Sequence, residues 1–479
     1  MQAPALLRHA AELLRQQLSS AQPPDAVAQE YFRHHKYLGS KERRAIAELV
    51  FGTLRCLELS EFLLQRLSCS VPAGIAREWL LLVAFGILSP AVGNPHIVPL
   101  LRTATLSEAD SSDSEFWCRL LQVHGWSSAE AEHFYRALRH GLCSLKAAVS
   151  QVLELPPSRW EEHHWQQFAA ACALPLWLVR EWLQHPLNGL SAAQLLSTCQ
   201  ALQRPALPCL RVNTLKAHPA ALVELLRQQG IAATPTPFSP VGIRLWERVT
   251  LSTLAPYRNG AVEVQEESSQ LVGYVVAPEP HWRIWDACAG AGGKALHLAV
   301  LQQDRGEIVA SDIAPLRLRA LQQRQRRAGL RSILTLLLRA DGTLPKSLPR
   351  SFDAVLIDAP CSGLGTLRRT PTLKWRLTPE GVQRHSQRQL SLLLRYSERV
   401  RPGGVLVYAT CSLLPHENQA VIARFCRERP EFSPEPATEV LARFGIVLPQ
   451  STPAGEPLQL LPSVHGTDGF FIARFRRSR

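Results

Sequence analysis

Two cysteines that follow apolar runs are the residues of this sequence best suited to covalent chemistry. Cys361 follows the run Ala354–Ile357 and the acid Asp358, and Cys411 follows the run Gly404–Ala409. Each run is short and uninterrupted, which is typical of a strand buried on both faces of a parallel sheet. Ligands of such sheets bind beyond the carboxyl ends of the strands. A lone cysteine is usually a small buried apolar residue, but two thiols at corresponding strand ends, one beside an acid, indicate a site.

A thiol pair beside an acid suits the transfer of a methyl group to C5 of cytosine. C5 is a poor nucleophile until a thiolate adds to C6 and converts the ring to an enamine, and covalent catalysis of this kind splits one difficult step into easier ones. An acid near N3 and N4, such as Asp358, would favour the addition by stabilising the protonated ring. One cysteine is enough for this chemistry, so the second thiol needs a separate role, such as assistance in releasing the product.

A glycine-rich turn earlier in the chain predicts the cofactor. Asp286–Lys294 places three glycines where a strand would pass into a helix, and backbone N–H groups at such a turn can approach a ligand. A phosphate-binding loop fails, because Cys288 and Ala295 break its motif. A dinucleotide motif is formally satisfied, and S-adenosylmethionine also fits. The two cysteines favour S-adenosylmethionine, since hydride transfer needs no pair of thiols.

Aspartates end four successive predicted strands, at Asp286, Asp312, Asp341 and Asp358. Each alone would be explained as a helix cap or a turn residue, but four in succession argue against capping alone. We expect Asp312 to bind ribose hydroxyls and Asp341 to meet an adenine amino group.

Basic charge is concentrated in the later part of the chain. The formal net charge is +13, of which residues 1–150 carry only +1, from 15 Lys+Arg and 14 Asp+Glu. Residues 366–401 carry nine basic residues against Glu380 and Glu398. A charge run is usually a solvated face, but this excess beside the two cysteines favours a phosphate-binding surface. The expected partner is therefore nucleic acid.

Composition argues against several other classes of protein. At 479 residues, with 46% hydrophobic and 19% charged residues, the chain predicts a globular protein of two or three domains. The most apolar stretch, Trp79–Leu88, is about half of a membrane span. Eleven cysteines without a Cys-x-x-Cys pair argue against a zinc ribbon and a disulfide framework. We expect no metal, no membrane contact, a monomer and a cytoplasmic location.

Hydrophobic patterns divide the chain into three parts. Residues 1–145 predict a helical bundle, and residues 146–275 predict linker helices followed by a small α+β module. Residues 276–479 alternate strand with helix, which predicts a Rossmann-like, doubly wound α/β catalytic domain. Its expected strands are Ile284–Asp286, Ile308–Asp312, Ile333–Asp341, Ala354–Asp358 and Val405–Thr410, with Gly469–Phe475 at an edge.

The two cysteine signatures, Asp358–Gly363 and Thr410–Ser412, resemble those of the RNA cytosine-C5 methyltransferases of the Sun/NOL1/NOP2 group. The resemblance covers about residues 170–475 and includes the segments Arg211–Lys216 and Gln265–Gln270. The N-terminal bundle more loosely resembles the NusB-like domain of bacterial Sun-type rRNA methyltransferases. That likeness makes small-subunit rRNA the expected substrate, with tRNA methylation or a non-catalytic role in ribosome assembly as alternatives.

This resemblance implies a role for each site residue. Cys411 would be the nucleophile and Cys361 would aid product release, although DNA cytosine methyltransferases use the Pro-Cys cysteine, which makes Cys361 the rival nucleophile. The S-adenosylmethionine site would comprise Cys288, Ala289, Gly290, Ala291, Gly292, Gly293, Lys294, Asp312, Asp341 and Asp358. The RNA contacts would come from Arg211, Asn213, Lys216, Arg369 and Lys374. Ala291 and Ala295 depart from the proline and threonine common in the family's glycine turn, but the glycines and Lys294 are kept, so we expect the cofactor site to stand.

Overall fold

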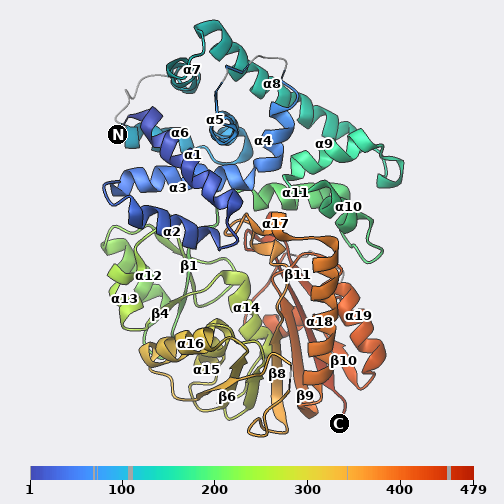
Figure 1. The fold of residues 1–479 in the computed structure, drawn as a ribbon. Helices are drawn as coiled ribbons and strands as arrows, with labels where there is room; N and C mark the ends of the chain where they lie inside the picture. Colours follow the sequence, from blue (N-terminus) through green and yellow to red (C-terminus); the bar gives the residue numbers. More distant parts are fainter. Residues whose placement is uncertain (1, 68–70, 73, 106–111, 342, 450–454) are drawn as a thin grey trace. The chain divides into compact units, whose positions relative to one another are not determined.

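The chain folds into two compact units in the computed structural model, which describes residues 2–67, 71–72, 74–105, 112–341, 343–449 and 455–479 (Figure 1). The helical unit comprises Met1–Pro205 together with Thr366–Leu377. The sheet unit comprises Ala206–Gly365 and Thr378–Arg479. One short stretch therefore leaves the sheet unit at Thr366 and returns to it at Thr378.

The helical unit is built from helices that bury apolar faces. Its helices are α1 (Ala3–Ser19), α2 (Pro24–His34), α3 (Ser40–Arg55), α4 (Leu57–Leu64), α5 (Arg77–Leu88), α6 (Ile97–Thr105), α7 (Asp113–Val123), α8 (Ser128–Val152), α9 (Glu162–Cys172), α10 (Leu176–Gln184), α11 (Ala192–Leu202) and α17 (Leu373–Arg376), with short 3-10 turns η1 (Ser89–Val92) and η2 (Pro157–Arg159). Ser112, Ser127 and Ser191 accept backbone N–H bonds at the starts of α7, α8 and α11, which satisfies donors that lack a partner within the helix. The predicted helical N-terminal region is confirmed.

A small antiparallel sheet opens the sheet unit. Its elements are β1 (Cys209–Val212), α12 (Pro219–Gln228), β2 (Ala233–Pro235), β3 (Gly242–Leu245), η3 (Leu251–Thr253), α13 (Ala255–Arg258) and β4 (Val262–Val264). The strand order is β2-β3-β1-β4. Leu210 pairs with Ile243 on one side and Val264 on the other, and Leu226 of α12 packs into the same core as Leu210. The predicted α+β module therefore forms around β1.

The larger sheet contains eight strands in the order β10-β12-β9-β8-β5-β6-β7, with β11 beside β12. Its elements are α14 (Glu267–Val276), β5 (Arg283–Asp286), α15 (Gly293–Leu301), β6 (Glu307–Asp312), α16 (Pro315–Ala328), β7 (Ile333–Leu337), β8 (Phe352–Asp358), η4 (Leu364–Thr366), α18 (Pro379–Ser397), β9 (Val400–Thr410), α19 (Gln419–Glu428), β10 (Phe432–Glu435), α20 (Ala437–Ala442), β11 (Leu458–Leu460), α21 (Pro462–His465) and β12 (Phe470–Arg477). Strands β5 to β9 pair in parallel, and β12 is antiparallel to both β9 and β10.

Helices cover both faces of this sheet. Neighbouring residues of β8 enter different cores, because Val355 packs with residues of α18 and α19 whereas Leu356 packs with residues of α14 and α15. Alternation of this kind is what a strand covered on both faces requires. The predicted Rossmann-like, doubly wound α/β class is confirmed (Figure 1).

Several predicted boundaries differ from the structure. The third strand of the larger sheet ends at Leu337, because Asp341 instead accepts the Thr343 amide at 2.8 Å in a side-chain turn. The last strand, β12, is not at an edge, since β10 pairs with its outer side. The helices between residue 146 and Pro205 group with the N-terminal helices and not with the small sheet. Within the described ranges, no helix combines the length and apolarity of a membrane span.

Candidate active site

The two cysteines meet at the carboxyl ends of neighbouring parallel strands. Asp358 of β8 pairs with Ala409 of β9, so the turns that follow these two strands begin side by side. The Sγ atoms of Cys361 and Cys411 lie 3.3 Å apart, and both side chains are partly exposed. Their hydrogen bond, together with burial, raises the pKa of the Cys361 thiol well above its ordinary value. Either sulfur can be the donor of this hydrogen bond.

A close backbone contact fixes the two cysteine turns together. The Gly365 amide donates to the carbonyl of Cys411 at 2.9 Å, and the Gly365 carbonyl accepts the Gly469 amide at 2.9 Å. A Cβ atom at Gly365 would lie 2.1 Å from the Gly469 carbonyl oxygen. Only glycine fits between these two chains, which leaves the turns little freedom to separate.

A buried carboxylate links the residues that follow each cysteine. Glu417 is 0% exposed; one of its oxygens accepts the Ser362 amide at 2.8 Å and the Gln389 side chain at 2.9 Å. Its other oxygen accepts the Ser412 hydroxyl. The Ser362 hydroxyl also donates to that of Ser412 at 3.1 Å. Sequence reasoning missed Glu417, because nothing in its local pattern distinguishes it from an ordinary surface acid.

An ion pair lies beside the thiols. Lys294, in the first turn of α15, places its Nζ 2.6 Å from Oδ2 of Asp358. The side chains are 10% and 30% exposed, respectively. The ammonium also lies 5.1 Å from the centre of the Phe470 ring. Because both charges are partly removed from water, each is stabilised mainly by the other. The pair is therefore held in one geometry.

The glycine turn presents backbone donors at the start of α15. Gly290 and Gly292 have φ values of +54° and +84°, a conformation that favours glycine. A Cβ at Gly292 would lie 2.4 Å from Leu321, whereas one at Gly290 would meet nothing within 4 Å. Asp312 accepts the Gly290 amide at 2.9 Å, so the predicted acid and the predicted turn are brought together. The space beside Gly290 is open to a ligand.

Asp286 ends β5 and is buried near the charged groups of Asp358 and Lys294. It is 0% exposed, and neither carboxylate oxygen makes a hydrogen bond of good geometry among the described residues. Burial raises the pKa of Asp286 to about 7, and the negative charge of Asp358 adds to the effect. Burial, followed by the charge of Asp286, also raises the pKa of the Cys288 thiol. Cys288 is therefore a neutral thiol, not a further nucleophile.

We expect Asp286 to make the protein less stable as the pH rises from about 4 to about 7. The carboxyl titrates near 7 in the folded protein but near ~3.9 in the unfolded chain. Between these values the folded protein holds a proton that the unfolded chain has released, so stability falls with rising pH. Urea unfolding at pH 4.5 and 7.5 measures the fall, and Asp286→Asn should reduce it by up to about 3 kcal/mol. An equal fall in both proteins would contradict this assignment.

Two of the predicted RNA-binding residues of the small sheet are buried, which corrects that prediction. Arg211 is 2% exposed and Asn213 is 3% exposed. Arg211 donates to the Gly293 carbonyl at 2.6 Å and to Gln265. Asn213 donates to the carbonyls of Gly260 and Ala328. Arg211 thus braces the glycine turn instead of binding a phosphate.

Lys374 requires the same correction, since it is 1% exposed and fully partnered inside the helical unit. Lys216 remains exposed, although its ammonium donates to the carbonyls of Asn259 and Arg327 at 2.6 and 2.9 Å. Arg369 is partly exposed. The sequence of a motif does not show whether a basic side chain faces solvent or a buried carbonyl, so it does not distinguish Lys216 and Arg369 from Lys374.

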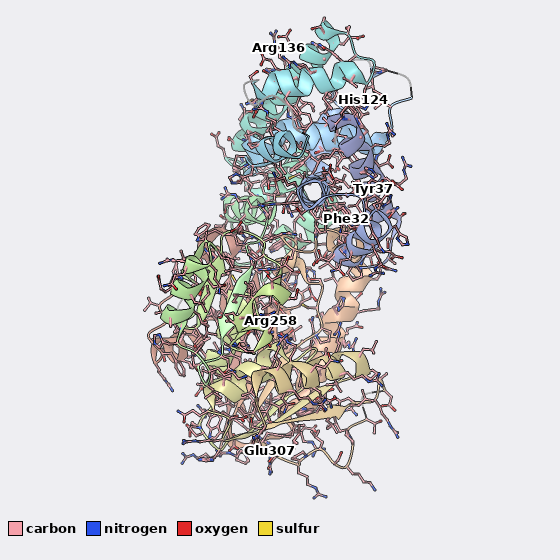
Figure 2. All side chains as sticks on the ribbon, turned by 90° about the vertical axis from the view of Figure 1, so that its left-hand side faces the viewer. Phe32, Tyr37, His124, Arg136, Arg258 and Glu307 are labelled. Atoms are coloured by element: carbon pink, nitrogen blue, oxygen red, sulfur yellow. The ribbon has the colours of Figure 1, made fainter. Side chains whose placement is uncertain are left out.

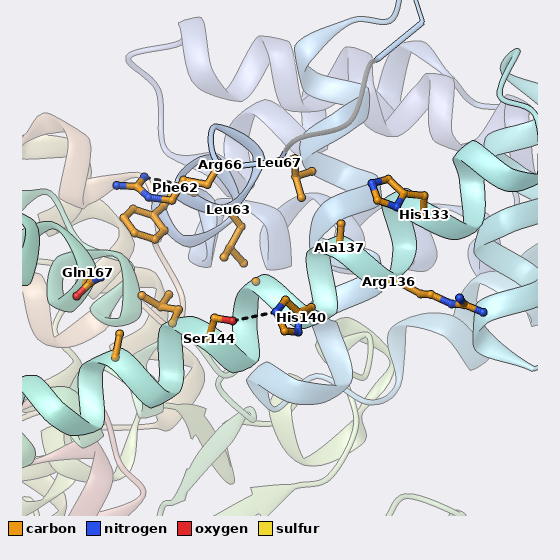
Figure 3. Close-up of a pocket in the computed structure, with 13 residues that line it drawn as sticks. Phe62, Leu63, Arg66, Leu67, His133, Arg136, Ala137, His140, Ser144 and Gln167 are labelled. Atoms are coloured by element: carbon orange, nitrogen blue, oxygen red, sulfur yellow. Dashed lines mark hydrogen bonds between the residues drawn. The ribbon is translucent and has the colours of Figure 1, made fainter.

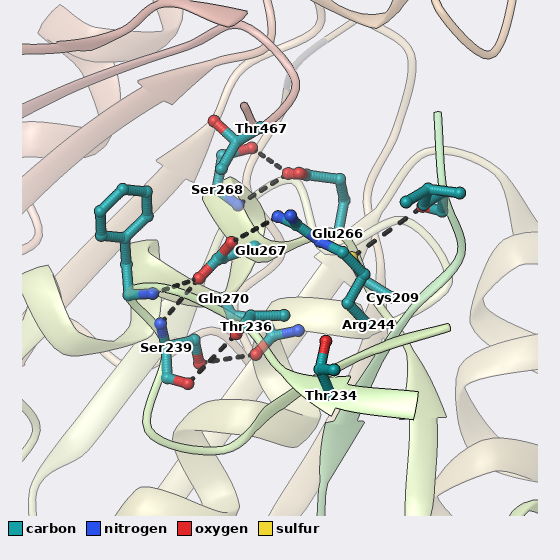
Figure 4. Close-up of polar contacts among 12 residues, drawn as sticks. Cys209, Thr234, Thr236, Ser239, Arg244, Glu266, Glu267, Ser268, Gln270 and Thr467 are labelled. Carbon is teal, nitrogen blue, oxygen red and sulfur yellow. Dashed lines mark hydrogen bonds and ion pairs between the residues drawn. The ribbon is translucent and has the colours of Figure 1, made fainter. Parts of the chain in front are cut away.

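The segment Gln265–Gln270 joins the small sheet to the larger one (Figure 4). Glu267 is 0% exposed and accepts the backbone amides of Phe238 and Ser239 at 2.6 and 2.9 Å. Glu266 accepts the Asp468 amide at 3.0 Å. These carboxylates act as acceptors for the backbone amides of two loops, in place of backbone carbonyls. The segment is therefore a structural brace.

The fold and these contacts define a class of protein. A doubly wound sheet with a glycine turn after β5 and the Lys294–Asp358 ion pair at the same edge is typical of an enzyme that binds a nucleoside-containing cofactor there. The chain belongs to the 16S rRNA methyltransferase RsmB/F family, whose model matches residues 273–476. The ferredoxin-like domain associated with that family matches residues 174–252.

Individual relatives agree with this family. The chain is 33% identical over 312 residues to the probable ribosomal RNA small subunit methyltransferase B of Bacillus subtilis, covering 65% of this chain and 68% of that protein. It is 29% identical over 470 residues to ribosomal RNA small subunit methyltransferase B of Yersinia pseudotuberculosis, covering 97% of each. Among solved structures, a methyltransferase homologue from Pyrococcus horikoshii has a TM-score of 0.54 at 28% identity and covers 67% of this chain and all 100% of its own. The chain is thus an rRNA methyltransferase that uses S-adenosylmethionine.

The glycine turn is chemically suited to that cofactor. Cys288, Ala289, Gly290 and Ala291 are all partly exposed, and open space adjoins Gly290. Asp312 provides carboxylate oxygens at the end of β6. Asp341 is exposed in the loop beyond β7, so its carboxylate remains accessible even though it lies outside the strand. Lys294 and Asp358 would border the reacting end of the site.

Proposed function

We propose that the protein methylates C5 of a cytosine in small-subunit rRNA through a covalent bond between a cysteine sulfur and C6 of the base. The observation that carries the proposal is the thiol pair, with sulfurs 3.3 Å apart, at strand ends that also hold the Lys294–Asp358 ion pair. S-adenosylmethionine supplies an electrophilic methyl group to this site. A methyl transfer to a nitrogen or a hydroxyl needs no such pair of thiols.

Attack by sulfur activates the ring. The thiolate forms a bond to C6, and the electrons of the C5=C6 double bond become available for C5 to take the methyl group. When C5 takes the methyl group, the methyl–sulfur bond of the donor breaks and S-adenosylhomocysteine is left. The C5 proton then passes to water, the electrons of the C–H bond re-form the C5=C6 double bond, and the C–S bond to C6 breaks and returns the thiolate. The target base has to be unstacked for a thiol to reach C6.

We assign the attack to Cys411 and the release to Cys361. In this assignment Cys361 is the hydrogen-bond donor of the sulfur pair, in which either atom can donate. A hydrogen bond from Cys361 would stabilise a thiolate on Cys411 before attack. After methyl transfer the same group can serve the departing sulfur. Cys361 as nucleophile, the rival assignment, would require the proton to lie on the other sulfur.

Asp358 would bind the polar edge of the cytosine. Its Oδ2 pairs with Lys294, and among the described residues no hydrogen bond is recorded at Oδ1. That second oxygen can accept from N4 or share a proton with N3, which favours addition at C6 by stabilising the protonated ring. Lys294 would hold the carboxylate in place during the reaction.

Small-subunit rRNA is the proposed substrate because the family and its relatives act on it. Further support comes from a hollow of about 820 Å³ in the helical unit (Figure 3). Its described lining includes Arg66, His133, Arg136 and His140 and contains no acidic side chain. Arg136 is also paired with Glu132 of the same helix, so Arg66 is the lining cation that we propose for an RNA phosphate. Lys216 in the sheet unit and Arg369 in the helical unit remain proposed RNA contacts. We also propose that the enzyme acts as a monomer in the cytoplasm.

Methylation assays with defined RNAs test the proposed function. We would incubate the protein and methyl-labelled S-adenosylmethionine with 16S rRNA, small subunits or total tRNA, and identify the modified nucleoside by mass spectrometry. The expected product is 5-methylcytosine in 16S rRNA only. Label in tRNA alone would support the tRNA alternative, and label at another atom would refute the thiol mechanism. No label with any RNA would favour a non-catalytic assembly factor.

A further inference from the structure

Helix α16 of the sheet unit carries positive charge without any acidic residue. Its five basic residues are Arg317, Arg319, Arg324, Arg326 and Arg327. The chain between Asp312 and Asp341 likewise contains neither Asp nor Glu. All the cations of the helix are arginines, whose planar guanidinium can bind a phosphate through two parallel hydrogen bonds. Contacts inside the protein decide which of these arginines are available to a ligand.

Two of the arginines are used within the sheet unit. Glu263 of β4, whose side chain is 3% exposed, pairs with Arg324 at 2.9 Å and also with Arg327. Arg324 donates to the Ala291 carbonyl at 2.8 Å, and the Arg327 guanidinium lies 4.0 Å from the centre of the Tyr257 ring. These two side chains hold the helix to the small sheet and to the glycine turn, so they are not available to a ligand.

Arg319 and Arg326 are in a different situation. Both are exposed, and neither side chain has an ion pair or a hydrogen bond with another described residue. They are seven residues apart, which places them on one face of the helix at a separation of about 10 Å along its axis. Leu318 and Leu321 of the same helix enter the core instead. The outward face of α16 therefore presents two unpaired guanidinium groups.

Further cations lie where α16 ends. A Cβ atom at Gly260 would lie 2.1 Å from the Arg327 carbonyl oxygen, so the ends of α13 and α16 are in contact. The Lys216 ammonium donates to the carbonyls of Asn259 and Arg327 at this junction. Two acceptors leave one of its three donors for a ligand. Arg258, the last residue of α13, is exposed and is labelled beside α16 in Figure 2.

The other end of α16 lies near the cofactor site. The helix begins at Pro315, three residues after Asp312, which ends β6 and accepts the Gly290 amide. Its 14 residues span about 21 Å. A polyanion that follows the outward face of α16 would therefore extend from the Lys216 junction toward the edge of the sheet that holds the glycine turn.

We propose that a basic face, formed by Arg319, Arg326, Lys216 and Arg258, binds backbone phosphates of the rRNA substrate. The inference rests on the proposed rRNA substrate and is independent of the thiol chemistry. Contacts to phosphates position an RNA without reading its sequence. The basic face would thus supply the electrostatic attraction that the buried Arg211 cannot supply.

The test measures RNA binding by the full chain as a function of salt. The variants are Arg319→Gln, Arg326→Gln and the double variant, in which glutamine keeps a high helix propensity. The ligands are a 16S rRNA transcript and an unrelated RNA of equal length, titrated from 50 to 200 mM KCl. Circular dichroism and the Kd for S-adenosylmethionine establish that each variant is folded.

Arg427→Gln provides the matched control. Arg427 is also an exposed arginine in the last turn of a helix, α19, and has no ion pair among the described residues. Phe425 of α19 and Leu321 of α16 belong to the cores on opposite faces of the sheet. The control therefore removes the same charge from the other face.

We expect each single variant to reduce the slope of log K against log[salt] by about 1, and the double variant by about 2. The double variant should bind both RNAs at least about fivefold more weakly at 50 mM KCl, with a smaller loss at 200 mM, because salt screens the lost attraction. The Kd for S-adenosylmethionine should stay within twofold of the parent. Arg427→Gln should change neither the slope nor the affinity for RNA.

An unchanged slope in the double variant would overturn the inference, and so would an equal change in Arg427→Gln, which would indicate an effect of net charge alone. A loss confined to 16S rRNA would indicate recognition of bases and not of phosphates. Unchanged RNA binding with weaker binding of polyglutamate would assign the face to an acidic protein instead. A reduced slope in a protein whose parent methylates no RNA would support the basic face and refute the proposed function, so the two failures are distinguishable.

Discussion

Cys411→Ala should abolish methyl transfer and form no covalent complex with RNA, whereas Cys361→Ala should accumulate one. Without the sulfur at position 411 no bond to C6 forms, and the rate should fall by at least about 10³-fold, as expected when a nucleophile is removed. Without Cys361 the attack still occurs, but the C–S bond breaks slowly. Denaturing gels of protein incubated with 16S rRNA and S-adenosylmethionine reveal the complex as a band of reduced mobility.

The double variant provides the control for this experiment. Cys361→Ala/Cys411→Ala should form no complex, which would show that the complex of the single variant depends on the second sulfur. A complex that forms with Cys411→Ala and not with Cys361→Ala would exchange the two roles. If both single variants lose activity equally and neither forms a covalent complex with RNA, the thiols act on each other and not on the base.

Asp358→Asn should lower kcat on the order of 10²- to 10⁴-fold, the range that general acid–base groups contribute. Asparagine keeps the shape of the side chain but loses the charge that pairs with Lys294 and that stabilises a protonated ring. Lys294→Met should act in the same direction, because Asp358 would lose its partner at 2.6 Å. Single-turnover methylation at saturating RNA measures the chemical step directly.

A second ion pair of the sheet offers the matched control. Arg283 lies 2.8 Å from Glu307, which begins β6 and is labelled in Figure 2. Glu307 is at the opposite end of β6 from Asp312, so Glu307→Gln should leave kcat within twofold of the parent. A similar loss in Glu307→Gln and Asp358→Asn would show that the effect arises from the sheet and not from the site.

Much of the sheet unit could be predicted from the sequence. Uninterrupted apolar runs that end in Asp286, Asp312 and Asp358 coincide with the ends of β5, β6 and β8. Both cysteine turns follow from the same patterns, because a fully covered parallel strand has few alternatives. The prediction that Asp341 ends a strand is wrong. Asp341 lies in a side-chain turn with Thr343, and such a turn leaves no apolar pattern in the sequence.

The partners of polar residues could not be predicted. Arg211 and Lys374 were expected to contact RNA because they are basic and lie in motifs, yet both are buried against carbonyls and amides from distant parts of the chain. Glu417 joins the two cysteine turns but has no recognisable neighbours in sequence. Periodicity reports which face of an element is apolar, and it carries no information on which distant carbonyl a cation will reach.

The segment Thr366–Leu377, which follows β8 in the chain but packs in the helical unit, also affects the order in which the protein can fold during synthesis. Glu58 and the carbonyl of Ala173, which accept hydrogen bonds from Lys374, emerge from the ribosome long before that lysine. At the usual elongation rate of about 5 to 20 residues per second, the delay between Pro205 and Thr366 is roughly 10 to 30 s. Throughout that interval the nascent helices lack the cation that neutralises Glu58. The helical unit, although translated first, can therefore complete its folding only after β8 has been synthesised. Folding of the two units is thus coupled in time.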